Sequence, residues 1–155
     1  MNDDRAQDAL RLAEAALADA LREGVTEAEA LVMSEDSALT RFANSEIHQN
    51  VAETNVTINL RVVVGKRVGV ASSGRTDAQG LRRLAENAAA IARVVEELED
   101  WGGLPGRTEI RDVAGAYSRT TADASPEFRA DGAAPLHRFD PTRRRRPVCQ
   151  PRPAS

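Results

Sequence analysis

An alternating run between Val56 and Val64 limits what this chain can fold into more than any other feature. Its apolar positions are separated by polar residues, with Val56, Ile58, Leu60, Val62 and Val64 on one side and Thr57, Asn59 and Arg61 on the other. A period of two fits a β-strand that has one face in a core and one in water. The run therefore predicts a half-buried strand.

The sequences on both sides of this run predict two hairpins. Gly65-Lys66 follows it directly, and apolar residues resume in segment 67–70, so a two-residue loop with Gly first fits a type II′ turn. Upstream, segments 39–43 and 46–51 flank a turn in which Asn44 tolerates the left-handed conformation. We expect each pair of segments to form an antiparallel hairpin.

The segments before the hairpins predict a helix and a further strand. From Asp3 to Arg22 apolar residues recur at helical spacing, and Gly24 suits a C-terminal cap. The expected apolar stripe consists of Ala6, Leu10, Ala13, Leu17, Ala20 and Leu21. Residues 28–33 are apolar apart from Glu29, which predicts a short strand.

A second amphipathic helix is expected after the hairpins. Thr76-Asp77-Ala78-Gln79 has the spacing of a capping box, in which Thr76 would be the N-cap. The apolar stripe runs through Leu81, Leu84, Ala88, Ile91 and Val95, with Arg82, Arg83, Glu86, Asn87 and Arg93 opposite. Such a helix lies on one face of a sheet. The predicted fold is α+β, with a two-layer arrangement and a mainly antiparallel sheet of about four to five strands between an N-terminal and a C-terminal helix.

Length and composition suggest one folded domain followed by a linker and a disordered tail. The chain has 155 residues, of which 41% are hydrophobic and only 3% aromatic, so the core must be aliphatic. We expect an α+β domain over residues 1–106, with Trp101 held against its edge. Residues 107–134 read as a linker, and residues 135–155, with six arginines and one aspartate, as a disordered Arg/Pro-rich tail.

Targeting signals and cysteine chemistry are missing from the sequence. There is no apolar run long enough for a membrane span, and the start lacks the basic and apolar regions of a secretory signal. We therefore expect a cytoplasmic protein. Cys149 is the only cysteine, so it forms no internal disulfide and completes no cysteine-based metal site.

Four groups of residues invite a chemical interpretation, and none of them supports one well. His48 and Glu46 share a strand face, but a zinc site needs three or four ligands. Gly65-Lys66 closes a hairpin rather than opening a helix, as a phosphate loop requires. Ser72 and Ser73 have no His–Asp pair nearby in sequence.

The fourth group, Arg143 to Arg146, has the charge to hold nucleic-acid phosphates. It lacks interleaved aromatic residues and a folded scaffold, so a solvated tail is the simpler interpretation. The sequence therefore predicts no catalytic, metal-binding or cofactor-binding residue in this chain.

Several segments, in order, resemble the N-terminal domain of the TldD/PmbA (TldE) family. They are SALTRFANSEIHQNV, the strand NVTINLRVVV, then GKRVGVASS and the helix beginning LRRLAENAAAIA. YSRTTADASPEF is similar to the continuation found in that family. PmbA-like members resemble the chain somewhat more than TldD-like ones.

The resemblance implies a place in a proteolytic complex without implying a catalytic residue here. The family, also described as modulators of DNA gyrase, is metallopeptidase-related and cytoplasmic, and its TldD-type subunits carry zinc on an HExxxH helix. TldD and TldE subunits pair and cut unfolded or peptide substrates. The chain contains no HExxxH sequence, so zinc is implied only for the partner or for a missing domain.

The expected function is that of a truncated family member, bacterial and inactive alone, that supports subunit pairing and a peptide-substrate channel. The abrupt change to PLHRFDPTRRRRPVCQPRPAS after Ala134 suggests a frameshift. Two alternatives stay open. One is a peptide-binding module that adds a strand at a sheet edge, for which Glu46, His48 and Asn50 offer a polar face. The other is a gyrase-associated or nucleic-acid-associated protein that acts through the basic tail.

Overall fold

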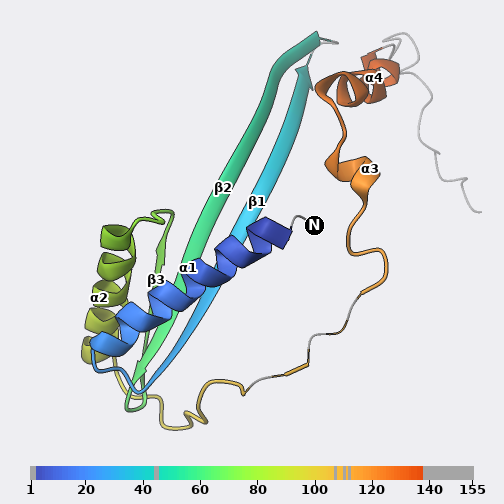
Figure 1. Ribbon diagram of the computed structural model, residues 1–155. Helices are drawn as coiled ribbons and strands as arrows, with labels where there is room; N and C mark the ends of the chain where they lie inside the picture. Colours follow the sequence, from blue (N-terminus) through green and yellow to red (C-terminus); the bar gives the residue numbers. More distant parts are fainter. Residues whose placement is uncertain (1–2, 44–45, 107, 110, 112, 138–155) are drawn as a thin grey trace, which may run out of the picture. The chain divides into compact units, whose positions relative to one another are not determined.

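The computed structural model describes residues 3–43, 46–106, 108–109, 111 and 113–137 (Figure 1). The elements in chain order are α1 (Asp3–Arg22), β1 (Glu27–Ala43), β2 (Glu46–Val64), β3 (Arg67–Ser73), α2 (Ala78–Val94), α3 (Arg119–Ala122) and α4 (Pro126–His137). The α+β class is confirmed, as is the N-terminal helix, whose bounds are those that the sequence predicts.

The three strands form one sheet in the order β1-β2-β3, so the chain runs from each strand to its neighbour. β2 and β3 are antiparallel, in a register that starts with Val64 opposite Arg67 and ends with Ile58 opposite Ser73. Gly65 has a φ of 66°, the left-handed conformation that the predicted two-residue turn requires. This hairpin is confirmed. The other turn, Asn44 and Ser45, lies outside the described residues.

The sheet has three strands rather than the four to five expected. The expected strands 28–33 and 39–43 are parts of one continuous β1, and segments 46–51 and 56–64 are parts of one continuous β2. Polar residues in the gaps between the expected segments face each other, since the Thr54 hydroxyl donates to Asp36 across the two strands at 2.7 Å. Backbone pairing continues past polar side chains because the ladder bonds involve only the main chain.

The core lies between one face of the sheet and the helices α1 and α2. Ile58, Leu60 and Val62 are fully buried, so the alternation predicted for β2 is confirmed. They pack with Ala16 and Ala20 of α1 and with the inner face of α2 in a single cluster. The core is aliphatic, as the low aromatic content predicts.

The apolar stripe predicted for α1 is only partly right. Ala16 and Ala20 are buried and Leu12 and Leu17 pack against the core, but the side chains of Leu10 and Leu21 are 58% and 61% exposed. The sequence has apolar residues over a wide arc of this helix, and periodicity does not tell which part of the arc meets the sheet.

The stripe predicted for α2 is right at Leu81, Leu84 and Ala88 but wrong at Ile91, because small residues form the rest of the contact. The buried positions are Gly80, Leu81, Leu84, Ala85, Ala88, Ala89 and Ala92, whereas Ile91 is 40% exposed. α2 lies directly against β3 at Gly69, where a Cβ atom would come within 2.1 Å of the Ala88 carbonyl oxygen. Helix and strand approach so closely that only small side chains fit between them.

The segment after α2 is hydrogen-bonded to the start of β1. Trp101 Nε1 donates to Glu27 Oε1 at 3.2 Å, and the Leu104 N–H donates to Glu27 Oε2 at 2.6 Å. Val63 is fully buried although it lies outside the main core cluster. The prediction that Trp101 is held against the edge of the domain is confirmed.

The described chain divides into two compact units. The first comprises residues 1–37 and 53–117, and the second residues 38–52 and 118–155. In the second unit, Arg129 of α4 donates to Thr40 and Asn50, both at 3.2 Å. α4 continues through His137, three residues into the stretch expected to be disordered. None of the helices in the described ranges has the length and apolar character that crossing a bilayer requires.

Candidate functional site

The residues that sequence reasoning considered for a metal site do not assemble one. His48 lies on β2 and its side chain is exposed. Within the described ranges there is no group of three or more His, Cys, Asp or Glu residues that could hold a metal ion. The residues that the structure describes therefore do not fit a zinc centre. The tail residues Arg143–Arg146 and Cys149 lie outside them.

Gly65-Lys66 serves as an attachment point for the chain that follows α2. The Lys66 Nζ atom donates to the Glu99 carbonyl oxygen at 3.0 Å, and the Lys66 carbonyl accepts from the Leu98 N–H at 3.0 Å. The pair thus joins the hairpin to the segment that carries Trp101. This is a structural role, as expected for a hairpin turn rather than a phosphate loop.

Ser72 and Ser73 end β3 and begin the connection to α2. The Ser72 hydroxyl donates to Asn59 Oδ1 at 2.8 Å, and the Ser73 hydroxyl accepts from the Arg75 N–H at 3.0 Å. Both serines are therefore hydrogen-bonded at the end of β3, just before the strand-to-helix connection in which the sequence placed them.

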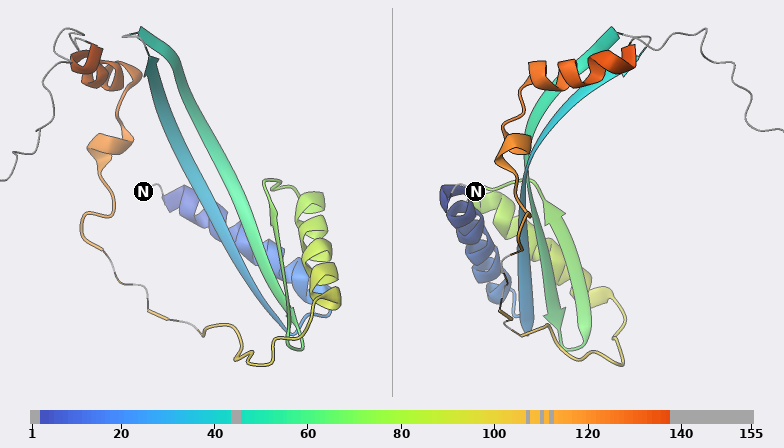
Figure 2. Two further views of the ribbon diagram at one scale, coloured as in Figure 1. Left: turned by 180° about the vertical axis from the view of Figure 1, so that it is seen from behind. Right: turned by 90° about the vertical axis from the view of Figure 1, so that its right-hand side faces the viewer.

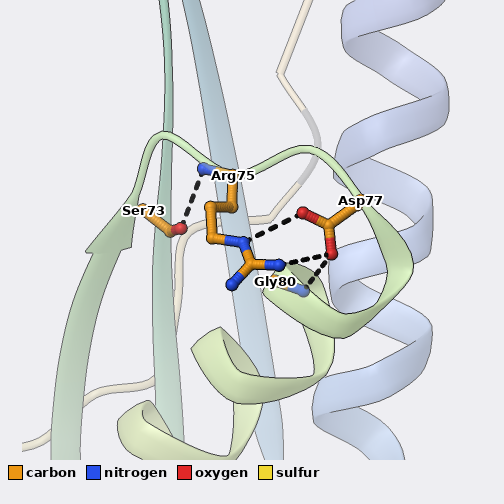
Figure 3. Close-up of polar contacts among 4 residues, drawn as sticks. All are labelled: Ser73, Arg75, Asp77 and Gly80. Carbon is orange, nitrogen blue, oxygen red and sulfur yellow. Dashed lines mark hydrogen bonds and ion pairs between the residues drawn. The ribbon is translucent and has the colours of Figure 1, made fainter.

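The start of α2 is organised by Asp77 (Figure 3). Asp77 Oδ1 accepts from the Gly80 N–H at 2.9 Å, so Asp77 and not Thr76 is the N-cap, which corrects the predicted capping box. Arg75 donates to both carboxylate oxygens of Asp77, at 3.0 and 3.1 Å. The hydrogen bonds from Arg75 and Gly80 hold the pKa of Asp77 below its usual value of 3.8, and Asp77 raises the pKa of Arg75.

A hollow of about 190 Å³ opens between the end of β3 and the first turns of α2. Its lining residues are Ser72, Ser73, Arg75, Gly80, Arg83, Leu84 and Asn87. Two are arginines, none is acidic, and Leu84 is a core residue that is 2% exposed. Sequence reasoning placed Arg83 and Asn87 on the solvent side of the helix, and their spacing of four is the signal that they project together.

A second hollow, of about 200 Å³, lies between α1 and the sheet. Its wall is apolar and its rim polar, and its lining residues are Arg5, Asp8, Ala9, Leu12, Val32, Ser34, Thr54 and Val56. Asp36, beside it, accepts hydrogen bonds from Thr54 and Arg5. These bonds hold the pKa of Asp36 below its usual value.

The sheet face turned away from α1 and α2, called the open face below, carries exposed apolar side chains. Asn59 contacts both Ser72 on β3 and Met33 on β1, which places these three residues on the same face. Leu31, Met33 and Val70 are 56%, 53% and 52% exposed. Strand 56–64 contributes polar Asn59 and Arg61 to this face. The alternation of that strand therefore did not predict the apolar side chains that its neighbours place there.

Comparison with known proteins agrees with this architecture. Residues 28–92 match the family described as PmbA/TldA metallopeptidase domain 1, a segment that includes nearly all of the sheet and of α2. Residues 28–92 of the chain are therefore similar to the first domain of the PmbA/TldD family.

Among solved structures, the crystal structure of TldE from Thermococcus kodakarensis has a similar fold. It matches 72% of this chain with a TM-score of 0.58 and 24% sequence identity. The match takes in 26% of TldE, so the chain spans about a quarter of the length of that protein. No curated protein sequence matches the chain.

Proposed function

We propose that this chain acts as the non-catalytic first domain of a PmbA/TldD-type metallopeptidase. In this role it pairs with a complementary TldD-type subunit and lines part of the route of an unfolded peptide substrate. The match of residues 28–92 to the first domain of the family carries the proposal. The lack of an HExxxH sequence agrees with a supporting rather than a catalytic role.

The open face supports the pairing part of this proposal. Leu31, Met33 and Val70 are each more than half exposed, next to the polar pair Glu29 and Arg61, whose Oε2 and Nη1 atoms lie 3.4 Å apart. Apolar side chains gathered on one face and bordered by polar residues are typical of a protein–protein interface. A second subunit would bury them.

The pairing is tested by mixing the purified chain with a TldD-type subunit from the same source and measuring mass by light scattering. We expect a mixed complex, whereas the chain alone should bind no stoichiometric zinc and should not cleave an unfolded casein substrate. A chain that alone bound one zinc ion tightly and cleaved casein would overturn the non-catalytic role.

Two leucine substitutions test whether the open face forms the interface. Leu31→Asp places a charge on the open face, and Leu10→Asp places one at an equally exposed position on α1, since the two leucines are 56% and 58% exposed. Burial of one leucine corresponds to about 1.5–3 kcal/mol, so Leu31→Asp should weaken pairing about tenfold or more. Equal affinity of the two variants would show that the interface lies elsewhere.

A second function, peptide binding by strand addition, is favoured by one observation. β3 is the last strand of the sheet, and no further strand lies beside it among the described residues.

A further inference from the structure

The outer edge of β3 offers main-chain groups to an added strand. β3 pairs with β2 along its whole length, from Arg67 to Ser73, and the right-hand view of Figure 2 shows it at the border of the sheet. In an antiparallel pair, alternate residues direct their N–H and C=O groups away from the partner strand. On β3 these groups point toward the border, where an extended peptide would continue the ladder.

This edge lacks the features that commonly protect edge strands. Natural edges are blunted by lysine, proline, bulges or inward-pointing charges. β3 has one charge, Arg67 at its first position, and the remaining residues are uncharged and free of proline. Arg67 is itself engaged, with its Nη2 atom 3.2 Å from Glu97 Oε1.

The hollow beside the end of β3 adds charge to this edge. Arg83 and Asn87 line it from α2, and Gly69 fixes α2 against β3 because its position leaves no room for a side chain. Asp77 accepts from the lining residues Arg75 and Gly80, and none of the described lining residues is acidic. The hollow thus complements a negatively charged group.

We propose that the β3 edge binds an extended peptide by strand addition, and that a carboxylate of this peptide lies in the hollow against Arg83. Main-chain hydrogen bonds supply affinity for any extended segment, while the guanidinium selects for the carboxylate. The carboxylate belongs either to an acidic side chain or to the peptide C-terminus. This inference rests on the strand-addition function and is independent of subunit pairing.

The end of the β1–β2 hairpin that contains Thr40 and Asn50 is a weaker candidate for peptide binding. There Asn50 Oδ1 accepts hydrogen bonds from Thr40 at 3.2 Å and from Arg129 of α4 at 3.2 Å. A polar face that already binds α4 has less to offer a peptide than the edge of β3.

The test is an NMR titration of the full ¹⁵N-labelled chain with short peptides of alternating threonine and valine. One peptide has blocked ends and a single glutamate near its C-terminal end, the second has glutamine there, and the third has glutamine and a free C-terminal carboxylate. We expect amide shifts along residues 67–73 and tighter binding of whichever peptide presents the carboxylate to the hollow. No shift in residues 67–73 with any peptide, or equal affinity of all three, would overturn the proposal.

Two charge reversals on neighbouring positions of α2 provide the matched control. Arg83→Glu should weaken the carboxylate peptide about tenfold, as expected for loss of one charge-assisted hydrogen bond, while Arg82→Glu, which changes the net charge equally outside the hollow, should not. A peptide with lysine in place of glutamate should bind Arg83→Glu better than the unmodified chain. Equal weakening by both reversals would indicate non-specific attraction and contradict the site. The titration uses the chain alone, so its result does not depend on whether the chain pairs with a TldD-type subunit.

Discussion

At the scale of single residues, Asp77 shows how one carboxylate fixes the start of a helix. Its Oδ1 atom satisfies the Gly80 N–H, which has no partner within the first turn, and Arg75 holds the carboxylate in place from the preceding loop. Thr76 and Asp77 are both good N-cap residues, so the sequence alone leaves two frames for the helix start. Arg75 follows β3 and donates to both carboxylate oxygens of Asp77, so it favours Asp77 over Thr76 as the N-cap.

Asp77 should make the stability of the domain depend on pH. Its pKa is lowered in the folded chain, chiefly by the hydrogen bond from Arg75. A carboxylate with a lowered folded pKa contributes stability above its unfolded pKa, and this contribution is lost as pH falls through the lowered value. Asp77→Asn keeps a capping oxygen but does not titrate. The melting temperature of Asp77→Asn should therefore lie below that of the unmodified chain at neutral pH and approach it in acid.

The measurement is thermal unfolding followed by circular dichroism at about pH 7 and about pH 3, the range over which a carboxylate titrates. Glu86→Gln, which removes one negative charge from the exposed side of the same helix, serves as the control. A difference between Asp77→Asn and the unmodified chain that is the same at both pH values would contradict the assigned role.

At the scale of elements, the contact between α2 and β3 depends on the absence of side chains. A Cβ atom on Gly69 would lie 2.1 Å from the Ala88 carbonyl oxygen and 2.6 Å from the Ala92 nitrogen. These are backbone atoms of a helix, so they cannot turn aside as a flexible side chain does. A prediction from apolar spacing favours large apolar residues. It therefore assigned Ile91 to the buried face, whereas Ala85 and Ala89 are the residues buried there.

Gly69→Ala should destabilise the domain by about 1–3 kcal/mol, because α2 must move away from the sheet to admit the methyl group. Gly74→Ala is the matched control, since its Cβ atom would meet only the Val56 carbonyl oxygen at an ordinary 3.5 Å. Urea unfolding monitored by the fluorescence of Trp101, the only tryptophan, measures both. Similar midpoints for the two variants would mean that helix and strand are less closely packed than described.

At the scale of the whole molecule, the core belongs to the first unit alone. All its clustered residues lie within residues 1–37 and 53–117, including those of α1, β2 and α2. α3 has no buried residue, and Phe128 on α4 is 65% exposed. We therefore expect the first unit to hold its core together by itself.

A chain that ends after Tyr117 should accordingly unfold at the same temperature as the full chain. A chain that ends after Val94 should unfold at a lower temperature, because it loses the contacts of Trp101 and Leu104 with Glu27. Thermal circular dichroism of the three chains distinguishes these outcomes. A lower melting temperature for the chain that ends after Tyr117 would show that residues 118–155 support the core.

The sequence by itself determined the local features of this protein. Alternation predicted the buried face of β2, the Gly65-Lys66 turn predicted the hairpin of β2 and β3, and helical spacing predicted α1 from Asp3 to Arg22. The order of these segments indicated the resemblance to the PmbA/TldD family, and residues 28–92 match the model of its first domain. Each of these features depends on neighbours along the chain, which a sequence displays directly.

Which parts of these elements meet follows from the packing of the folded chain. The fold joined the four segments that precede β3 into two long strands, because main-chain pairing ignores the polar side chains in the gaps between them. It also turned the small residues of α2 toward Gly69 and brought Arg83 beside the edge of β3. These contacts join residues far apart in sequence, so they follow from how closely two surfaces fit and not from the periodicity of either one.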